Sequence, residues 1–423
     1  MFGSSIAGTW IAHILAACAF YWFLSYFFNK KISFSGAILF FIHAKILTDW
    51  GLTFYGGSIS FLGSCLFFGG FFRIVDQIRI KSAIFVGIGL SLMLLHRPFE
   101  SVLTALLPAF YLIICIIRIF KNEPLKTAFN LGFKLTIPIV TILLTTISFI
   151  FYYNKSVTGN ILTLPRSEYS KQYEIVRPFL FQKVKEPPLI ANPQIFEWHQ
   201  KKEVENHLKS REGIKGYFYG FIMKIVYFWS YFFGLIFTIP LVLYFISKKY
   251  KRDHLMIGSV LIVFFGSTFV IYEWHQYFSI ITPILFYFVV FGLKRLNINA
   301  RTDNLSRALM VSVVLIVGME LVLALFSHIH SNRISHAQQK DNIVKQLLKN
   351  EGKDLVCVKY EKGHIIFQEW VYNKAKIDKS EIVWARHLGD AKNMELIEYY
   401  DNSRNVWIVF PDRIPVEIMP YKN

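Results

Sequence analysis

Apolar residues fill most of the chain in stretches about as long as a membrane-spanning helix, which needs roughly 20 mostly apolar residues. We interpret ten of them as spans: 5–28, 33–49, 57–73, 80–95, 101–120, 131–153, 217–247, 255–271, 277–293 and 307–328. The stretch 80–95 is short, so a re-entrant segment is its alternative. The stretch 217–247 is long enough to tilt or kink, and Pro240 is the expected kink.

The short segments between the apolar stretches carry much of the positive charge. The basic ones are 29–31, 73–81, 118–126, 248–252 and 294–301. With ten spans they occupy every second connection, so all of them face the cytoplasm under the positive-inside rule. Topology therefore explains the formal net charge of +18, and nucleic acid is not an expected partner.

The remaining connections then lie on the outer face, together with the tail after Ser327. They are 48–56, 96–100, 154–215 and 273–277. The loop 154–215 is long for a connector, and we consider a lid, an acceptor platform or a solvated linker. Part of this loop, residues 193–209, has the pattern of an amphipathic helix lying along the membrane interface.

Residues 330–423 have a different pattern, and we expect a small α/β domain there, after a transmembrane domain of residues 1–329. The periodicity predicts helices at 338–349 and 393–400, and strands at 355–360, 382–384 and 406–410. Strand–helix–strand order favours a partly parallel sheet. No Gly-rich phosphate loop is present, so no nucleotide site is expected.

The segment His96-Arg97-Pro98-Phe99-Glu100 places ionisable groups between two apolar stretches. Charge at the edge of a hydrocarbon layer is costly and marks a pathway, a partner or a catalytic group. Arg97 can hold a phosphate or carboxylate in a bidentate fork. An Arg97–Glu100 ion pair is the structural alternative, and Glu100 could also serve only the helix N-terminus.

The connection 48–56 supplies a second set of candidates. Asp49 could be a catalytic base, a metal ligand or a solvated loop acid. Tyr55 fits an interfacial aromatic belt or a substrate contact. Gly56 and Gly57 would let a ligand or another backbone approach closely.

A third set follows in Glu273-Trp274-His275-Gln276-Tyr277. His275 could bind a phosphate, move a proton or only form a local hydrogen bond. The cysteines are not spaced like a disulfide framework or a metal site: Cys18, Cys65, Cys115 and Cys357. We name no metal ligand and no definite cofactor, and a divalent cation stays open.

Several motifs, in their order along the chain, resemble a group of bacterial polytopic proteins. That group has Tyr-Trp-Gly-Gly, Arg-Pro-Tyr-Glu and an Asn–Thr-Gly–Leu-Pro pattern. The matching segments are Phe54-Tyr55-Gly56-Gly57-Ser58, His96–Glu100, Tyr153–Asn160 with Leu164-Pro165, Trp274–Tyr277 with Pro283, and, in the tail, Glu369–Asn373, Val383–Arg386 and Val406-Trp407. The resemblance covers nearly the whole chain.

The group is similar to GT-C membrane glycosyltransferases of the dolichyl-phosphate-mannose-protein mannosyltransferase type. The resemblance implies a multi-pass protein of the bacterial cytoplasmic (inner) membrane, with its C-terminal domain extracytoplasmic and with lipids as neighbours. It implies inverting transfer of a sugar from a polyprenyl-phosphate donor to a protein or glycan acceptor on the outer face. Arg97 and His275 would face the phosphate, with His96 and Tyr277 beside them.

The chain departs from this group at its beginning. Members are expected to carry an acidic catalytic segment ahead of the region that matches Gly8-Thr9-Trp10, where this chain starts. A truncated or inactive scaffold subunit is therefore one alternative function. A transporter of a lipid or envelope precursor is another, although no internal repeat or matching pair of broken helices is visible. Asp49 and Glu100 are the acids left as base candidates.

Overall fold

The computed structural model describes residues 7–54, 56–186, 196–198, 203–211, 213–247, 251–271, 274–330, 336–349, 351–365, 368–374, 376–401 and 403–421. The chain divides into two compact units. The helical unit comprises Met1–Glu168, Pro178–Phe181 and Lys209–Ser327. The C-terminal unit comprises Tyr169–Arg177, Gln182–Leu208 and His328–Asn423.

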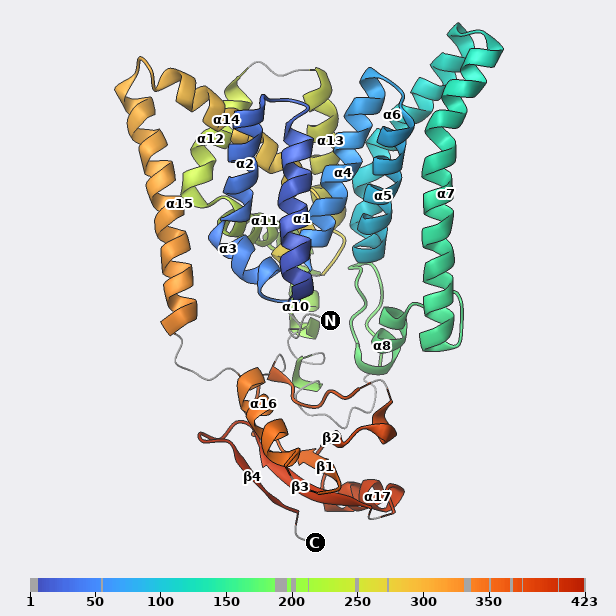
Figure 1. Cartoon of the computed structure of the whole chain (residues 1–423), viewed down its shortest axis with the longest axis vertical. Helices are drawn as coiled ribbons and strands as arrows, with labels where there is room; N and C mark the ends of the chain where they lie inside the picture. Colours follow the sequence, from blue (N-terminus) through green and yellow to red (C-terminus); the bar gives the residue numbers. More distant parts are fainter. Residues whose placement is uncertain are drawn as a thin grey trace. The chain divides into compact units, whose positions relative to one another are not determined.

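The helical unit is built from helices that follow the predicted apolar stretches (Figure 1). Their bounds are α1 (Ala7–Leu24), α2 (Lys30–Phe41), α3 (Ala44–Ile46), η1 (Leu47–Gly51), α4 (Gly57–Asp76), α5 (Ile80–His96), α6 (Pro98–Asn122), α7 (Leu125–Thr158), α11 (Gly213–Phe232), α12 (Gly234–Ile246), α13 (Lys251–Ser267), η3 (His275–Phe278), α14 (Thr282–Asn299) and α15 (Asn304–His330). The long loop carries α8 (Pro165–Tyr173) and α10 (Glu203–Ser210). Helix α10 overlaps the C-terminal part of the helix predicted at 193–209 and ends one residue beyond it. Residues 193–195 and 199–202 of that prediction lie outside the described residues.

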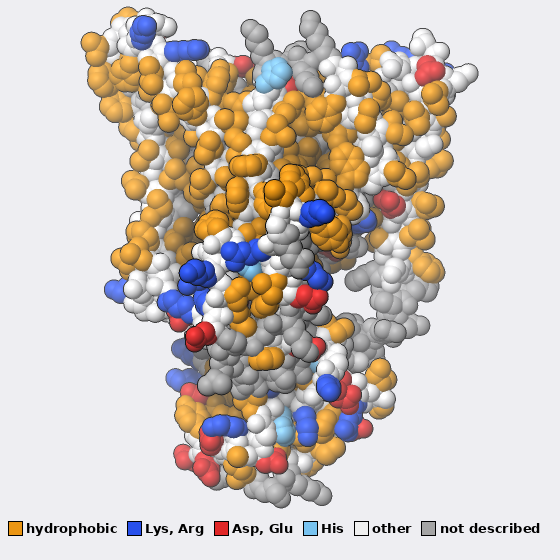
Figure 2. All heavy atoms as spheres, turned by 180° about the vertical axis from the view of Figure 1, so that it is seen from behind, with side chains coloured by type: hydrophobic (Ala, Val, Ile, Leu, Met, Phe, Trp, Pro, Cys, Tyr) orange, Lys and Arg blue, Asp and Glu red, His pale blue; other side chains and the backbone are white. Residues whose placement is uncertain are grey.

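Five helices of the described chain are long and apolar enough to cross a membrane: α1, α4, α6, α7 and α15. The bent pairs α2 with α3–η1, at 56°, and α11 with α12, at 100°, raise the number to seven. Helix α5 is apolar but has only 17 residues. The outer surfaces of α6, α7 and α15 are largely apolar, and Figure 2 shows apolar side chains over much of one face. These features indicate a multi-pass membrane protein.

The stretch 217–247 is bent, but not at Pro240, the place that its sequence offers for a kink. The sharp bend lies at the junction of α11 and α12, where Gly234 has a φ of +51°. Pro240 stays inside α12 without ending it. A glycine readily adopts the left-handed conformation that interrupts a helix and lets the chain turn, whereas the N–H that proline lacks can be tolerated inside a packed helix.

Aromatic packing and close helix contacts form the core of the helical unit. The Phe40 and Phe61 rings stack 3.9 Å apart, and both side chains are fully buried. Helix α4 packs against α1 and α5, and α5 also packs against α7 (Figure 1). A Cβ atom at Gly63 would lie 2.8 Å from the Gly89 carbonyl oxygen. Small residues thus allow α4 and α5 to approach closely, as in other membrane helix pairs.

The C-terminal unit contains a four-stranded mixed sheet in the order β2-β1-β3-β4. Strand β1 pairs in parallel with β2 and β3, and β4 pairs antiparallel with β3. The predicted strands, helices and partly parallel sheet are confirmed, while β4 was not predicted. The elements are α16 (His336–Leu347), β1 (Lys353–Val358), η5 (Ile377–Lys379), β2 (Ile382–Arg386), α17 (Asp390–Tyr399), β3 (Arg404–Phe410) and β4 (Glu417–Pro420).

Helices cover both faces of this sheet. Val356 and Val358 pack with Ile343 of α16, whereas Leu355 packs with Ile397 of α17. Neighbouring residues of a strand point to opposite faces, so β1 needs apolar residues at successive positions. The run Leu355-Val356-Cys357-Val358 meets that need, and all four side chains are fully buried.

Candidate functional site

Arg97 and Tyr277 come together at one end of the helical unit. Arg97 is the single residue between α5 and α6, and Tyr277 lies in the short helix η3. The Arg97 guanidinium carbon is 4.0 Å from the centre of the Tyr277 ring. This cation–π contact joins two of the three predicted segments.

The Arg97 guanidinium has an N–H group that can donate a hydrogen bond to a ligand. Its Nε atom is buried and has no hydrogen-bond partner among the described residues. None of the ion pairs between described residues joins Arg97 to Glu100, so the structural alternative is not supported. A guanidinium stacked on a ring keeps its N–H groups in its own plane, where an anion can accept them.

His96 lies against the glycine pair at the start of α4. Its Nδ1 atom hydrogen-bonds to the Ser60 hydroxyl. Gly56 has a φ of +74°, and a Cβ atom there would lie 2.4 Å from His96 Nε2. Gly57 lies similarly close to the Trp50 ring. Close approach is therefore what the two glycines provide; Tyr55 lies outside the described residues.

Asp49 and His275 form the second contact between predicted segments. Asp49 Oδ2 is 3.4 Å from His275 Nε2, an ion pair when the imidazole is protonated. The His275 ring stacks on Tyr231 at 3.5 Å between centres, and the Tyr231 hydroxyl donates to the Lys45 carbonyl at 2.9 Å. Asp49 keeps 35% of its side chain exposed, so its carboxylate remains accessible beside a fixed imidazole.

Glu100 has a different setting. It lies in the first turn of α6, where a carboxylate favours the helix N-terminus. Its neighbour Phe99 packs edge-on against Phe179 of the long loop, 5.2 Å between ring centres. Leu180 N donates to the Phe269 carbonyl at 2.8 Å, which ties this part of the loop to the end of α13. A segment of the predicted outer loop thus lies beside the Arg97 junction.

Three residues of this neighbourhood were not identified from the sequence: Ser60, Tyr231 and His13. His13 is fully buried in α1, 3.1 Å from the Ser58 hydroxyl. Polar residues inside apolar stretches were the available signal for His13 and Ser60. Tyr231 gave none, because aromatic residues are common near membrane interfaces.

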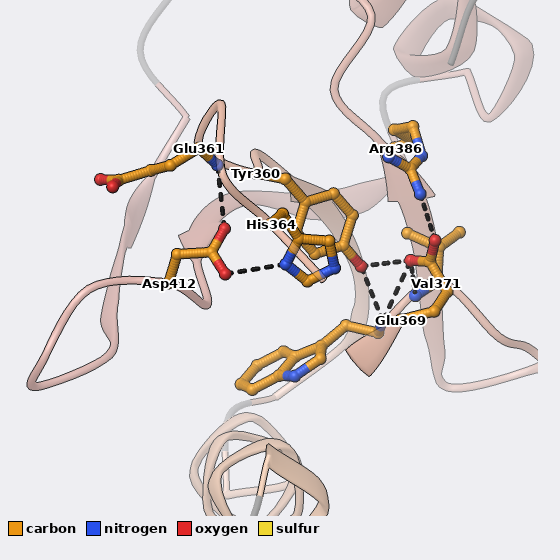
Figure 3. Close-up of polar contacts among 8 residues, drawn as sticks. Tyr360, Glu361, His364, Glu369, Val371, Arg386 and Asp412 are labelled. Atoms are coloured by element: carbon orange, nitrogen blue, oxygen red, sulfur yellow. Dashed lines mark hydrogen bonds and ion pairs between the residues drawn. The ribbon is translucent and has the colours of Figure 1, made fainter. Parts of the chain in front are cut away.

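A separate polar cluster lies in the C-terminal unit (Figure 3). Glu369 accepts hydrogen bonds from the Tyr360 hydroxyl and from Arg386. His364 Nδ1 is 2.7 Å from Asp412, and its ring stacks on Tyr360 at 3.8 Å. Burial, and then the hydrogen bond to Glu369, raises the pKa of Tyr360. Tyr360 is therefore a donor at neutral pH, and the cluster links Tyr360 and Glu369 to Arg386 of strand β2.

No group of three or more His, Cys, Asp or Glu side chains that could hold a metal ion occurs among the described residues. Asp49 and His275 are a pair without a third such ligand in that part of the chain. A divalent cation therefore stays an open alternative. At this site the chain offers one arginine, one carboxylate–imidazole pair and a second histidine. This arrangement can bind an anion beside a proton acceptor.

Comparison with known proteins finds no similar protein. No family model, no curated protein and no solved structure matches the chain. The likeness to GT-C glycosyltransferases accordingly stays an expectation from the motifs.

Proposed function

We propose that this protein is a GT-C-like membrane glycosyltransferase that uses a polyprenyl-phosphate sugar. The supporting observation is the meeting of three distant segments through the Arg97–Tyr277 and Asp49–His275 contacts. Such a meeting supplies the two groups that the transfer needs, a cation for the phosphate and a base for the acceptor. We also propose the full ten-span topology, in which this end of the helical unit faces out of a bacterial cytoplasmic membrane.

In this mechanism the in-plane N–H groups of Arg97 hold the lipid phosphate. These hydrogen bonds strengthen as negative charge grows on the departing phosphate oxygen, and this lowers the activation free energy of sugar transfer. The acceptor hydroxyl loses its proton to the Asp49 carboxylate and attacks the anomeric carbon. A bond from that carbon to the acceptor oxygen forms as the bond to the phosphate oxygen breaks, with inversion.

His275 has a positioning role in this proposal. Stacked on Tyr231 and 3.4 Å from Asp49, it fixes the direction of the carboxylate. Its charge, when protonated, also adds to the positive field that Arg97 creates around a phosphate. Glu100 is the alternative base, and its place one helical turn from Arg97 makes it the natural comparison.

The test uses membranes containing the full chain and a polyprenyl-phosphate sugar labelled in the sugar. Label should move into a non-lipid acceptor, and Arg97→Ala and His275→Ala should reduce this transfer at least tenfold. Arg79→Ala is the matched control, because Arg79 is an exposed arginine whose side chain donates to Gln77 and lies outside the site. Equal transfer in Arg97→Ala and Arg79→Ala would remove the site assignment.

The base is identified by a second pair of variants. Asp49→Asn should abolish transfer while donor binding remains, since the phosphate contacts are untouched. Glu100→Gln should leave transfer within about threefold of the wild type. The reverse order of effects would make Glu100 the base. No transfer by the unchanged chain above membranes lacking it, with every donor tried, would refute the enzyme proposal.

A further inference from the structure

A groove of about 700 Å³ lies between α2, α14 and α15 of the helical unit. Its size is within the range of small-molecule sites, which is roughly 300–1,000 Å³. Its walls are mostly apolar, including Ile38, Val290, Val313 and Val317. None of the predicted site residues lines it.

The only charged side chains among the lining residues are two lysines, and both lie at one end. Lys31 is in the first turn of α2, and Lys294 is near the C-terminal end of α14. Neither has an ion-pair partner among the described residues, and Lys294 lies 5.5 Å from the Phe28 ring centre. An apolar groove with positive charge at one end matches an amphipathic anion.

The length of the groove indicates which amphiphile fits. It follows α2 from Lys31 to Ile42, a rise of about 16 Å at 1.5 Å per residue. One leaflet of the hydrocarbon core is about half of 30 Å thick. The apolar wall is therefore as long as the acyl chain of a lipid in the leaflet next to the lysines.

We propose that this groove binds an anionic phospholipid, with its phosphate at Lys31 and Lys294 and an acyl chain along α2 and α15. Basic pockets between membrane helices recognise lipid head groups in this way. The proposal does not depend on the glycosyltransferase assignment, because it concerns different residues and lipid binding without reaction.

The test is a titration of the purified full chain with phosphatidylglycerol, followed by native mass spectrometry. Phosphatidylcholine with the same acyl chains is the comparison lipid. We expect a saturable first lipid that prefers phosphatidylglycerol by at least tenfold. The Lys31→Gln/Lys294→Gln variant should bind it on the order of thirtyfold more weakly. The control Lys30→Gln/Arg295→Gln removes the same charge from adjacent exposed positions of the same helices and should bind normally.

A second variant tests the acyl-chain half of the proposal. Gly318 lines the groove, and a Cβ atom there would meet nothing within 4 Å. Gly318→Leu should therefore fill the groove without disturbing the fold and should abolish binding of both lipids. Gly8→Leu, equally unobstructed but outside the groove, is its control.

The proposal is overturned if either target variant binds phosphatidylglycerol like its control, or if both lipids bind equally. It is also overturned if polyprenyl phosphate displaces phosphatidylglycerol at an equal concentration, which would assign the groove to the donor lipid. A dimer that forms through this face and excludes lipid would overturn it as well.

Discussion

The Arg97 guanidinium carbon lies 4.0 Å from the centre of the Tyr277 ring. Arg97 is the single residue that connects α5 to α6, and Tyr277 lies in the short 3-10 helix η3. The aromatic face therefore fixes the plane of the guanidinium, and that plane decides where an anion can bind. In the proposed function this contact makes Tyr277 a positioning residue, a role that the motif alone did not define.

Changing Tyr277 should separate this role from simple packing. Tyr277→Phe keeps a ring under Arg97, whereas Tyr277→Leu keeps apolar bulk without the π face. Cation–π contacts contribute about 0.5–2 kcal/mol, so the leucine variant should lower kcat/KM for sugar transfer roughly 3- to 30-fold relative to phenylalanine. Equal kcat/KM in the two variants would argue against the stacking role.

Gly56→Ala should destabilise the start of α4, because the added methyl group would clash with His96. Its φ of +74° is costly for any residue with a Cβ, by roughly 1–2 kcal/mol, and the new atom would meet His96 Nε2 at 2.4 Å. We expect a lower thermal midpoint in detergent than for Gly8→Ala, whose added atom meets nothing within 4 Å. Adding His96→Ala to Gly56→Ala should restore part of the loss. A midpoint equal to that of Gly8→Ala would contradict this account.

The helices of the membrane part were predictable because hydrocarbon demands long apolar stretches with internal hydrogen bonds. The bend of α11–α12 was not. Pro240 is a strong local signal, but the bend lies at Gly234, which has a left-handed φ, and a single glycine among apolar residues is a weaker signal in the sequence. Strand β4 was also missed, because Glu417–Pro420 is a short edge strand beside β3 and its sequence hardly differs from that of a loop.

The candidate site was predictable in part. Charge at a membrane edge identified Arg97 and His275, because such charge is costly and rare. The partners of these residues could not be inferred, since Tyr277, Tyr231 and Asp49 are joined to them by tertiary contacts and not by spacing. The Arg97–Glu100 ion pair, the structural alternative that the spacing offered, does not form among the ion pairs of the described residues.

Arg404 should be a main source of stability in the C-terminal unit. Its side chain is buried and its guanidinium donates to the carbonyls of Asp378, Asp354, Ser380 and Glu381 at 2.9–3.3 Å. Arg404→Met would leave buried acceptors unpaired, at a cost of about 3 kcal/mol or more. Arg404→Lys should recover only part of the lost stability, because one ammonium group cannot reach all four carbonyl oxygens.

Hydrogen exchange of β1 amides in the full-length protein measures this effect. Protection should fall in the order wild type, Arg404→Lys, Arg404→Met. Arg413→Met is the control, because Arg413 is 41% exposed and pairs with Glu417 and Glu361 at the surface. Its effect should stay within about 1 kcal/mol. Similar losses in Arg404→Met and Arg413→Met would refute the central role of Arg404.

Lys340 should make the stability of the C-terminal unit depend on pH. Its ammonium donates to the Trp370 carbonyl and lies 3.1 Å from the Tyr372 ring centre. Burial, opposed by the nearby Glu369 charge, lowers the pKa of Lys340 from 10.5 to about 7. Between these two values the unfolded chain holds more protons than the folded one. The free energy of unfolding should therefore rise with pH across this window, by at most about 1.4 kcal/mol per pH unit.

Exchange of β1 amides at several pH values, compared between variants at each pH, tests this prediction without interference from intrinsic exchange rates. Protection of the wild type relative to Lys340→Met should increase from pH 7 to pH 9, because the variant has no group that titrates there. Lys345→Met is the matched control on the same helix, since Lys345 is 67% exposed and pairs with Asp341. Relative to Lys345→Met, wild-type protection should stay constant over this range. A constant ratio for Lys340→Met as well would mean that Lys340 keeps its proton throughout, held by the carbonyl and the aromatic ring.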